Sequence, residues 1–262
     1  MTVNEVFSLL EREVAPVSLS REQCELSGFH DNSGIILNFG GNVTGILFCL
    51  DLTPAAAEKA AASGFNLIVT HHPAIFGGIM SLSDAPSSPT RALAMCARGG
   101  ISVISMHLNF DAAPRGIDFW LMCGLGGKTQ VAVLNKLSCG EYGRVYEVSA
   151  QSFEEYSNSV LAEFKSPHCR FYDGGRTVRR VASFCGSGAD EESIKFALEN
   201  NADTFVSADI KHHHIAALIS AGFNVIELTH YASEIYGFER IYASIKPLLK
   251  LPSDFFIQQI LL

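Results

Sequence analysis

The sequence predicts an α/β protein in which helices alternate with buried strands. Two patterns carry this prediction. Segments with apolar residues spaced three and four apart, as on one face of a helix, recur along the chain. Each ends in a small or glycine-containing turn and is followed by a short apolar run, the pattern of a strand covered on both faces. Apolar residues make up 48% of the 262 positions and charged residues 18%, so the chain can bury a sizeable core.

The alternation of helix and strand is complete in four places. The predicted helix and the strand that follows it occupy residues 53–64 and 65–72, 90–100 and 101–111, 190–201 and 202–213, and 212–222 and 223–234. Glycine at or near the end of most of these helices is a C-terminal stop signal. Regular alternation of this kind favours parallel pairing of the strands.

The remaining segments are less regular. Residues 1–14 predict an amphipathic helix opened by a capping box of Thr2 and Glu5. Residues 33–52 read as two strands joined near a glycine pair, which predicts a hairpin. Further strands are expected at residues 143–149, 168–175 and 178–186, with a helix at 152–164, and the glycine-rich residues 121–130 are the best candidate for a domain boundary.

Composition narrows the classes of function. The net charge of −8 and the pI near 5.6 argue against broad binding to nucleic acid or an anionic membrane. The one compact basic group, Arg176, Arg179 and Arg180, is most simply a solvated face. The sequence shows no bilayer-spanning run and no signal peptide, and its seven cysteines contain no CxxC pair. We therefore expect a cytoplasmic protein with reduced thiols.

Histidines stand at the ends of three predicted strands, and in two cases an acid follows four residues later. These residues are His71 and His72, His107 with Asp111, and His230 with Glu234. Because Pro114 and Gly116 disfavour a continuous helix after His107, we expect Asp111 on a loop, whereas Ser233 is expected to cap a new helix. The C-terminal ends of strands in an open α/β sheet share one edge, where ligand sites concentrate.

Four imidazoles and two carboxylates are too many ligands for one tetrahedral ion. They suit two divalent ions bridged by a carboxylate at a separation of roughly 3.5–4 Å. Nitrogen and oxygen donors favour zinc, iron or manganese over calcium. A single strand-end histidine is more often structural and an acid in a first turn is usually a cap, but three such ends together favour a shared metal site.

Several segments resemble a known family. Residues 51–79, 107–121, 207–213 and 229–234 are similar to the signature segments of the NIF-three-like family, also catalogued as GTP cyclohydrolase I type 2. Residues 31–34 and 185–211 resemble further segments of it, in the same order. The sequence departs from the family pattern at Thr229 and Cys185, where glycine is common, and at residues 207–209. None of these departures removes a ligand.

The resemblance implies two interleaved α/β domains with mixed sheets flanked by helices, one of residues 1–125 with 229–262 and the other of residues 126–228. It also implies a homo-oligomer, a hexameric ring. For the metal centre it implies two divalent ions per chain, and the ligands carried over are His71, His72, His107, Asp111, His230 and Glu234.

The first functional hypothesis is a metal-dependent hydrolase acting on a nucleotide or a related small molecule. Lys211 is a candidate to bind a substrate phosphate, and His213 to act as acid, base or partner of a ligand. A solvated helix start explains both residues equally well. The alternative function is a non-enzymatic metal-holding scaffold, metallochaperone or regulatory partner. A nucleic-acid-binding ring is disfavoured by the acidic composition.

Overall fold

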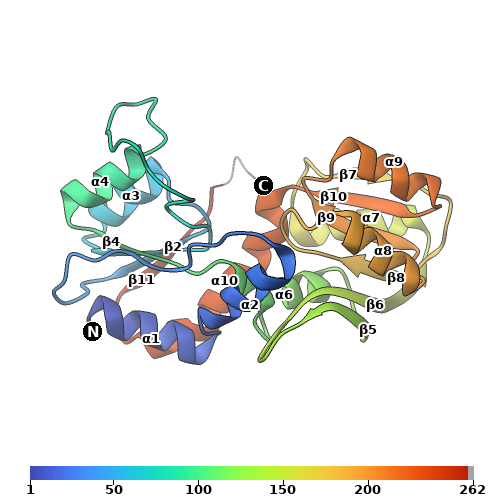
Figure 1. Cartoon of the computed structure of the whole chain (residues 1–262), viewed down its shortest axis with the longest axis horizontal. Helices are drawn as coiled ribbons and strands as arrows, with labels where there is room; N and C mark the ends of the chain where they lie inside the picture. The colour runs from blue at the N-terminus through green and yellow to red at the C-terminus, as the bar shows by residue number, and fades with distance from the viewer. Residues whose placement is uncertain (259–262) are drawn as a thin grey trace. The chain divides into compact units, whose positions relative to one another are not determined.

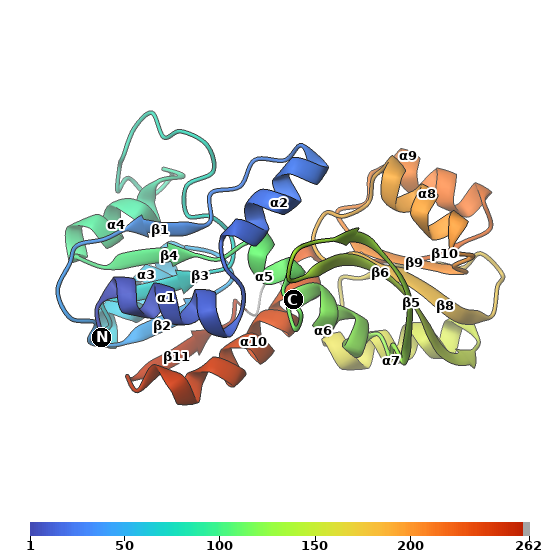
Figure 2. The ribbon, with the colours of Figure 1, turned by 60° about the horizontal axis from the view of Figure 1, so that its bottom comes forward.

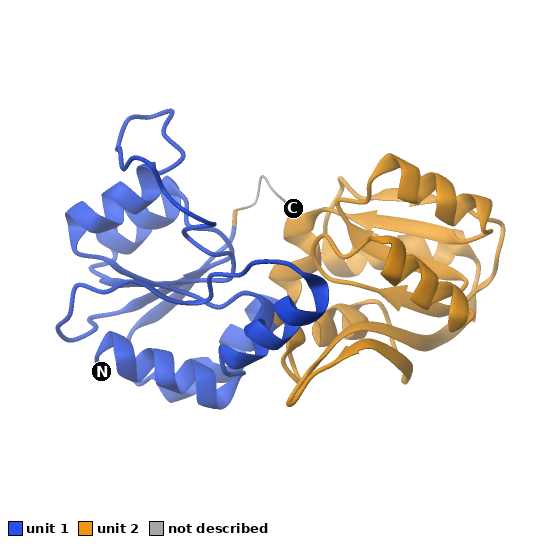
Figure 3. Cartoon of the chain, viewed as in Figure 1, with its two compact units in different colours: residues 1–110, 238–257 blue, residues 111–237, 258–262 orange. Residues whose placement is uncertain are grey.

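The structure is a computed structural model that describes residues 1–258. The chain forms two compact units (Figure 3). Unit 1 contains residues 1–110 and 238–257, and unit 2 contains residues 111–237 and Gln258. The sequence placed the boundaries after residues 125 and 228 instead. Residues 117–124 and the backbone of Gly237 belong to unit 2 because they pack there, where a Cβ on Gly237 would lie 2.7 Å from Ile117 Cα.

Unit 1 is built on a mixed sheet in the order β1-β4-β3-β2-β11 (Figures 1 and 2). Its strands are β1 (Gly34–Leu37), β2 (Ile46–Cys49), β3 (Leu67–Thr70), β4 (Ser102–Ser105) and β11 (Ser253–Phe256). Strands β4, β3, β2 and β11 run parallel, whereas β1 is antiparallel to β4. The three central strands are fully buried, as their continuous apolar runs predict.

Helices cover both faces of this sheet. They are α1 (Val3–Glu13), α2 (Ser18–Ser27), α3 (Pro54–Ala62), α4 (Arg91–Gly99) and the later part of α10 (His230–Leu249). Helices α3 and α4 lie on one face, and α1 and α10 on the other (Figure 1). On the α3–α4 face, Ala57 and Cys96 pack with Ile68 in one core cluster. On the other face the Phe48 ring lies 4.9 Å from the ring of Tyr242.

The predicted hairpin at residues 33–52 is wrong. Strand β1 pairs with β4 at one edge of the sheet, and β2 pairs with β3 and β11. Gly40 and Gly41, both with φ of 75°, turn the chain within the long connection between the two strands. All four residues of β2 are buried, which flanking strands and helices on both faces achieve and an exposed edge hairpin does not.

The helix and strand alternation predicted from the sequence is confirmed in all four places, by α3–β3, α4–β4, α8–β9 and α9–β10. The capping box at the N-terminus is confirmed as well. Thr2 Oγ1 accepts the Glu5 N–H at 3.3 Å, and the Glu5 carboxylate accepts the Thr2 N–H at 2.7 Å. No helix within residues 1–258 combines the length and the apolarity needed to cross a bilayer.

Unit 2 is built on a second mixed sheet, in the order β5-β6-β8-β9-β10-β7. Its strands are β5 (Thr129–Lys136), β6 (Glu141–Gln151), β7 (Arg170–Tyr172), β8 (Val178–Ser183), β9 (Thr204–Ala208) and β10 (Asn224–Leu228). The middle strands β8, β9 and β10 are parallel, and the flanking pairings are antiparallel. The C-terminal ends of β9 and β10 therefore lie side by side, as do those of β3 and β4 in unit 1.

Helices again cover both faces of the unit 2 sheet. They are α6 (Ile117–Gly124), α7 (Phe153–Phe164), α8 (Glu191–Glu199) and α9 (His212–Ser220). Helices α8 and α9 lie on one face, and α6 and α7 on the other (Figure 2). Phe184 and Phe205 stack in the core beneath α8 and α9, with ring centroids 5.1 Å apart.

A buried ion pair lies between α6 and β6. The Arg144 guanidinium donates to the Asp118 carboxylate at 2.9 Å, and their side chains are 2% and 0% exposed. Burial raises the pKa of Asp118 to about 6, although the charge of Arg144 acts to lower it. The carboxylate also accepts the Gly143 N–H at 3.1 Å, so it ties α6 to the start of β6.

Candidate metal centre

Three histidines come together in unit 1. His71 and His72 directly follow β3, and His107 follows the neighbouring strand β4. Because these strands are parallel and adjacent, their C-terminal ends meet at one edge of the sheet. One ring nitrogen from each histidine lies within 4.8 Å of those of the other two. His71 and His107 are buried and His72 is half-buried, so the cluster can hold a metal ion.

Each of these imidazoles is held at Nδ1 by an oxygen atom. The partners are Met106 O for His71 at 3.0 Å, Asp51 Oδ1 for His72 at 2.6 Å and Asp31 Oδ1 for His107 at 2.8 Å. Metal-ligating histidines make this contact, which fixes the tautomer and the ring orientation so that Nε2 can ligate. The geometry therefore suits a metal site.

The contact between His107 and Asp31 is reinforced by Ser33. Ser33 Oγ donates to Asp31 Oδ2 at 2.5 Å and accepts the His107 N–H at 3.0 Å. Burial acts to raise the pKa of Asp31, but the hydrogen bonds and charge of His107, with the Ser33 hydroxyl, lower the pKa to about 2. Asp31 therefore stays a carboxylate, which is the form that accepts the His107 N–H.

Sequence reasoning missed Asp31 and Asp51 as functional residues. Asp51 stands two residues after β2, so the strand-end argument used for the histidines also applies to it. Asp31 carries no such signal, because it precedes the edge strand β1 and reaches His107 across 76 positions of sequence.

Unit 2 carries a second group of ligand types at the start of α10. His230 is the first residue of the helix and Glu234 lies one turn later, with His230 Nε2 3.1 Å from Glu234 Oε1. His230 Nδ1 is 2.6 Å from the carboxylate of Asp209, which follows β9. The parallel pairing of β9 and β10 brings these strand ends together. His230 thus has the same kind of Nδ1 partner as the histidines of unit 1.

The helix begins earlier than the sequence predicted. Thr229 Oγ1 accepts the Ala232 N–H at 3.0 Å, so Thr229 caps α10 and the prediction that Ser233 does so is wrong. Ser233 lies inside the helix, where its hydroxyl accepts the Gly186 N–H at 3.1 Å. Because the helix already includes His230, the four-residue spacing to Glu234 puts both side chains on one helical face.

Asp111 also differs from its prediction. It lies within the short helix α5 (Leu108–Ala112) rather than on a loop. Pro114 comes after the end of this helix, so it does not prevent the turn that contains Asp111. The Cys185 thiol donates to Asp111 Oδ1 at 3.4 Å, and both side chains are buried. Burial and the Asp111 carboxylate raise the pKa of Cys185 well above its usual range, so this thiol stays protonated and donates.

Gly186 leaves the space that Glu234 occupies. A Cβ at this position would lie 2.5 Å from Glu234 Oε1, and the backbone has a φ of 60°. Both facts favour glycine. Imidazole nitrogens and carboxylate oxygens are the donors that zinc, iron and manganese accept. The three histidines of unit 1 therefore fit a divalent metal ion, and His230 and Glu234 of unit 2 offer the same types of donor.

The predicted substrate residues lie at the start of α9. Lys211 precedes the first helical residue and His213 is exposed, with its ring 4.2 Å from the ring of His214. In the same loop, Asp209 contacts His230. The roles of Lys211 and His213 in binding substrate stay predictions.

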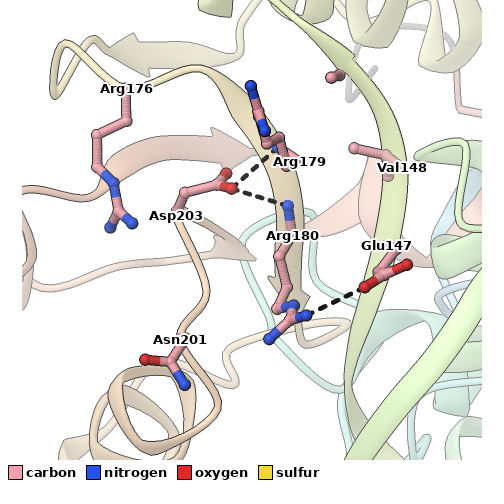
Figure 4. A pocket seen from close by; sticks show the side chains of 8 residues that line it. Glu147, Val148, Arg176, Arg179, Arg180, Asn201 and Asp203 are labelled. Carbon is pink, nitrogen blue, oxygen red and sulfur yellow. Dashed lines mark hydrogen bonds and ion pairs between the residues drawn. The ribbon is translucent and has the colours of Figure 1, made fainter.

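The arginine group of unit 2 lines a cavity of about 440 Å³ (Figure 4). Arg176 donates to the Ala202 carbonyl at 3.3 Å and Arg180 to the Asn200 carbonyl at 3.2 Å. These carbonyls follow the C-terminus of α8, where a helix attracts cations. Arg176 and Arg179 are exposed, as the predicted solvated face requires, and the bonds of Arg176 and Arg180 also hold the α8–β9 turn. Asp203 adds to these contacts by accepting the backbone N–H groups of residues 179 and 180 at 2.9 and 2.8 Å.

Two mixed sheets flanked by helices, each with imidazole and carboxylate groups at its parallel edge, define a candidate metal-binding protein of the α/β class. Residues 1–259 match the family described as Duf34/NIF3 (NGG1p interacting factor 3), and the chain belongs to this family.

Bacterial relatives are similar to this chain over most of its length. A "GTP cyclohydrolase 1 type 2 homolog" of Campylobacter jejuni is 28% identical over 90% of this chain and 88% of its own length. A "GTP cyclohydrolase 1 type 2" of Helicobacter pylori is 29% identical over 90% and 91%. The crystal structure of a hypothetical protein from Staphylococcus aureus has the same fold, with a TM-score of 0.81 at 22% identity over 98% of this chain and 96% of its own.

Proposed function

We propose that this protein binds two divalent metal ions per chain, zinc, iron or manganese, and hydrolyses a nucleotide or a related small molecule. The proposed ligands are His71, His72, His107, Asp111, His230 and Glu234. The observation that carries the proposal is that all four of these histidines have Nδ1 held by a carboxylate or a backbone carbonyl. Such partners orient imidazoles for metal ligation. The names of the relatives support a nucleotide as the substrate.

Bound divalent ions would lower the pKa of a coordinated water and stabilise charge that develops on a substrate oxygen. The chain's own contribution is orientation. Asp31, Asp51 and Asp209 fix the imidazole rings of the three histidines they contact. In unit 2, Gly186 has no Cβ that would clash with the Glu234 carboxylate, and the Cys185 thiol donates a hydrogen bond to one oxygen of Asp111.

Elemental analysis and a turnover screen test the proposal together. Protein purified without added metal should contain about two ions per chain, as a dinuclear site requires, and Glu234→Gln should lower this content without unfolding the chain. The metal-loaded protein is then screened against nucleotides, phosphoesters and cyclic amides, and any hydrolysis should vanish in His71→Ala. Metal content well below one ion per chain after reconstitution would refute the metal site. Hydrolysis that survives in His71→Ala would refute the catalytic role.

A second candidate function is a non-enzymatic metal-holding scaffold or regulatory partner. The family description, an NGG1p interacting factor, records an interaction rather than a reaction. Full metal occupancy without turnover of any compound in the screen would favour this candidate. We also propose the homohexamer that the resemblance implies. Light scattering on the purified protein measures its molar mass and so tests this oligomeric state.

A further inference from the structure

We propose that Phe29 and Phe76 form a stacking platform for a planar heteroaromatic ring, such as a nucleobase, in the substrate of the metal centre. This inference rests on the proposed function and narrows its substrate class. The platform belongs entirely to unit 1 and adjoins His107.

The two phenylalanines lie against each other and against the same histidine. Their ring centroids are 5.6 Å apart in an edge-to-face arrangement. The His107 ring lies 6.3 Å from Phe29 and 6.1 Å from Phe76. Both aromatic rings are therefore neighbours of a proposed metal ligand.

The phenylalanines are exposed although they are large and apolar. Phe29 is 44% exposed and Phe76 is 56% exposed. They come from separate segments, Phe29 just after α2 and Phe76 after β3. Asn32 Nδ2 donates to the Ile75 carbonyl at 2.8 Å and joins the two segments. A hydrogen bond that holds two exposed rings beside a ligand gives a defined surface rather than scattered apolar residues.

The chemistry of this surface favours one kind of occupant. An aromatic face stacks on any planar base and adds little affinity for a phosphate. The rings adjoin His107, so a molecule bound to a metal held by His107 would have them as neighbours. A planar ring with an atom that can bind the metal fits both requirements, whereas a simple phosphoester has no ring to stack on the phenylalanines.

The test measures binding of two probes to the zinc-loaded full-length protein by titration calorimetry. Guanosine 5′-monophosphate carries a planar base, and ribose 5-phosphate lacks it. Phe29→Leu and Phe76→Leu keep an apolar side chain but remove the aromatic face. We expect each substitution to weaken binding of the nucleotide about tenfold and to leave binding of ribose 5-phosphate unchanged.

Phe39→Leu is the matched control. Phe39 is 48% exposed, and its N–H donates to Ser102 Oγ at the start of β4, whereas His107 follows the end of that strand. The substitution should leave binding of both probes unchanged. Melting temperature and zinc content are measured for every variant, so a folding or metal defect is separated from a binding defect.

The outcomes separate this inference from the proposed function. Unchanged nucleotide binding in both variants at full zinc content overturns the platform and leaves the metal centre standing. The same follows if the zinc-loaded protein binds ribose 5-phosphate but not the nucleotide. A change in oligomeric state without a change in affinity assigns the two rings to contact with a second copy and also overturns the platform. Failure of the wild-type chain to take up zinc overturns both proposals.

Discussion

Replacing Asp31 by Asn tests the best-defined contact of the candidate metal centre. Asparagine keeps the size of the side chain but removes the charge that faces His107. The pKa of Asp31 falls from 3.8 to about 2 in the folded protein. Each unit of pKa shift corresponds to about 1.4 kcal/mol, so the ionised carboxylate contributes about 2 kcal/mol to the free energy of unfolding. Its side chain is 2% exposed, so solvent screens this contribution little.

Urea denaturation of the metal-free protein measures this loss. At pH 7 the free energy of unfolding should fall by about 2 kcal/mol in Asp31→Asn. Because the folded-state pKa is lowered, the contribution is fully present above about pH 4 and is lost as the pH falls through about 2. The difference between wild type and variant should therefore shrink across this range.

The same substitution should weaken zinc binding by about 10- to 100-fold, because the variant orients His107 less firmly. A competition titration against a chelator measures the affinity. Asp84→Asn is the control, since Asp84 pairs with Arg98 on the surface of the same unit and an exposed pair contributes about 0–1 kcal/mol. Equal zinc affinity in wild type and Asp31→Asn would refute the role assigned to Asp31.

Three further substitutions give independent tests. Gly186→Ala should lower the metal content by displacing Glu234, since the new Cβ would lie 2.5 Å from its Oε1; elemental analysis that finds full occupancy would contradict this. Arg144→Met should cost about 3–5 kcal/mol in urea denaturation at pH 7, because Asp118 loses its buried partner. Without the cation the pKa of Asp118 rises further, so the loss should become smaller as the pH falls from 7 toward about 6, where the wild-type carboxyl also takes up a proton. A loss that does not vary with pH would refute this account. Asp203→Ala should cost about 1–3 kcal/mol by leaving two backbone N–H groups without their acceptor, and an unchanged urea midpoint would rule that out.

Much of the site follows from local sequence patterns. His71 and His107 end apolar runs, and the rule that parallel strands share an edge brings them together without further information. The partner of His107 does not follow in this way. The contact from Asp31 to His107 spans 76 positions, and no local pattern selects that carboxylate among the others.

The errors have a similar cause. Residues 33–52 contain two strands, as predicted, but the choice of partners depends on burial of β2 by segments far away in sequence, including β11. The start of α10 was misplaced because Thr229 and Ser233 are both good caps, and only the backbone path decides between them. Local propensity therefore located the elements, whereas long-range packing set their neighbours.

The carboxylate partners of the histidines also bear on electroneutrality. In unit 1, Asp31 and Asp51 bring two carboxylates to the three imidazoles, which equals the charge of one divalent ion held there. Such a centre has no excess positive charge with which to attract a phosphate dianion. The metal would favour a neutral carbonyl or ring atom, and the phosphate of a nucleotide would need cations elsewhere, such as Lys211.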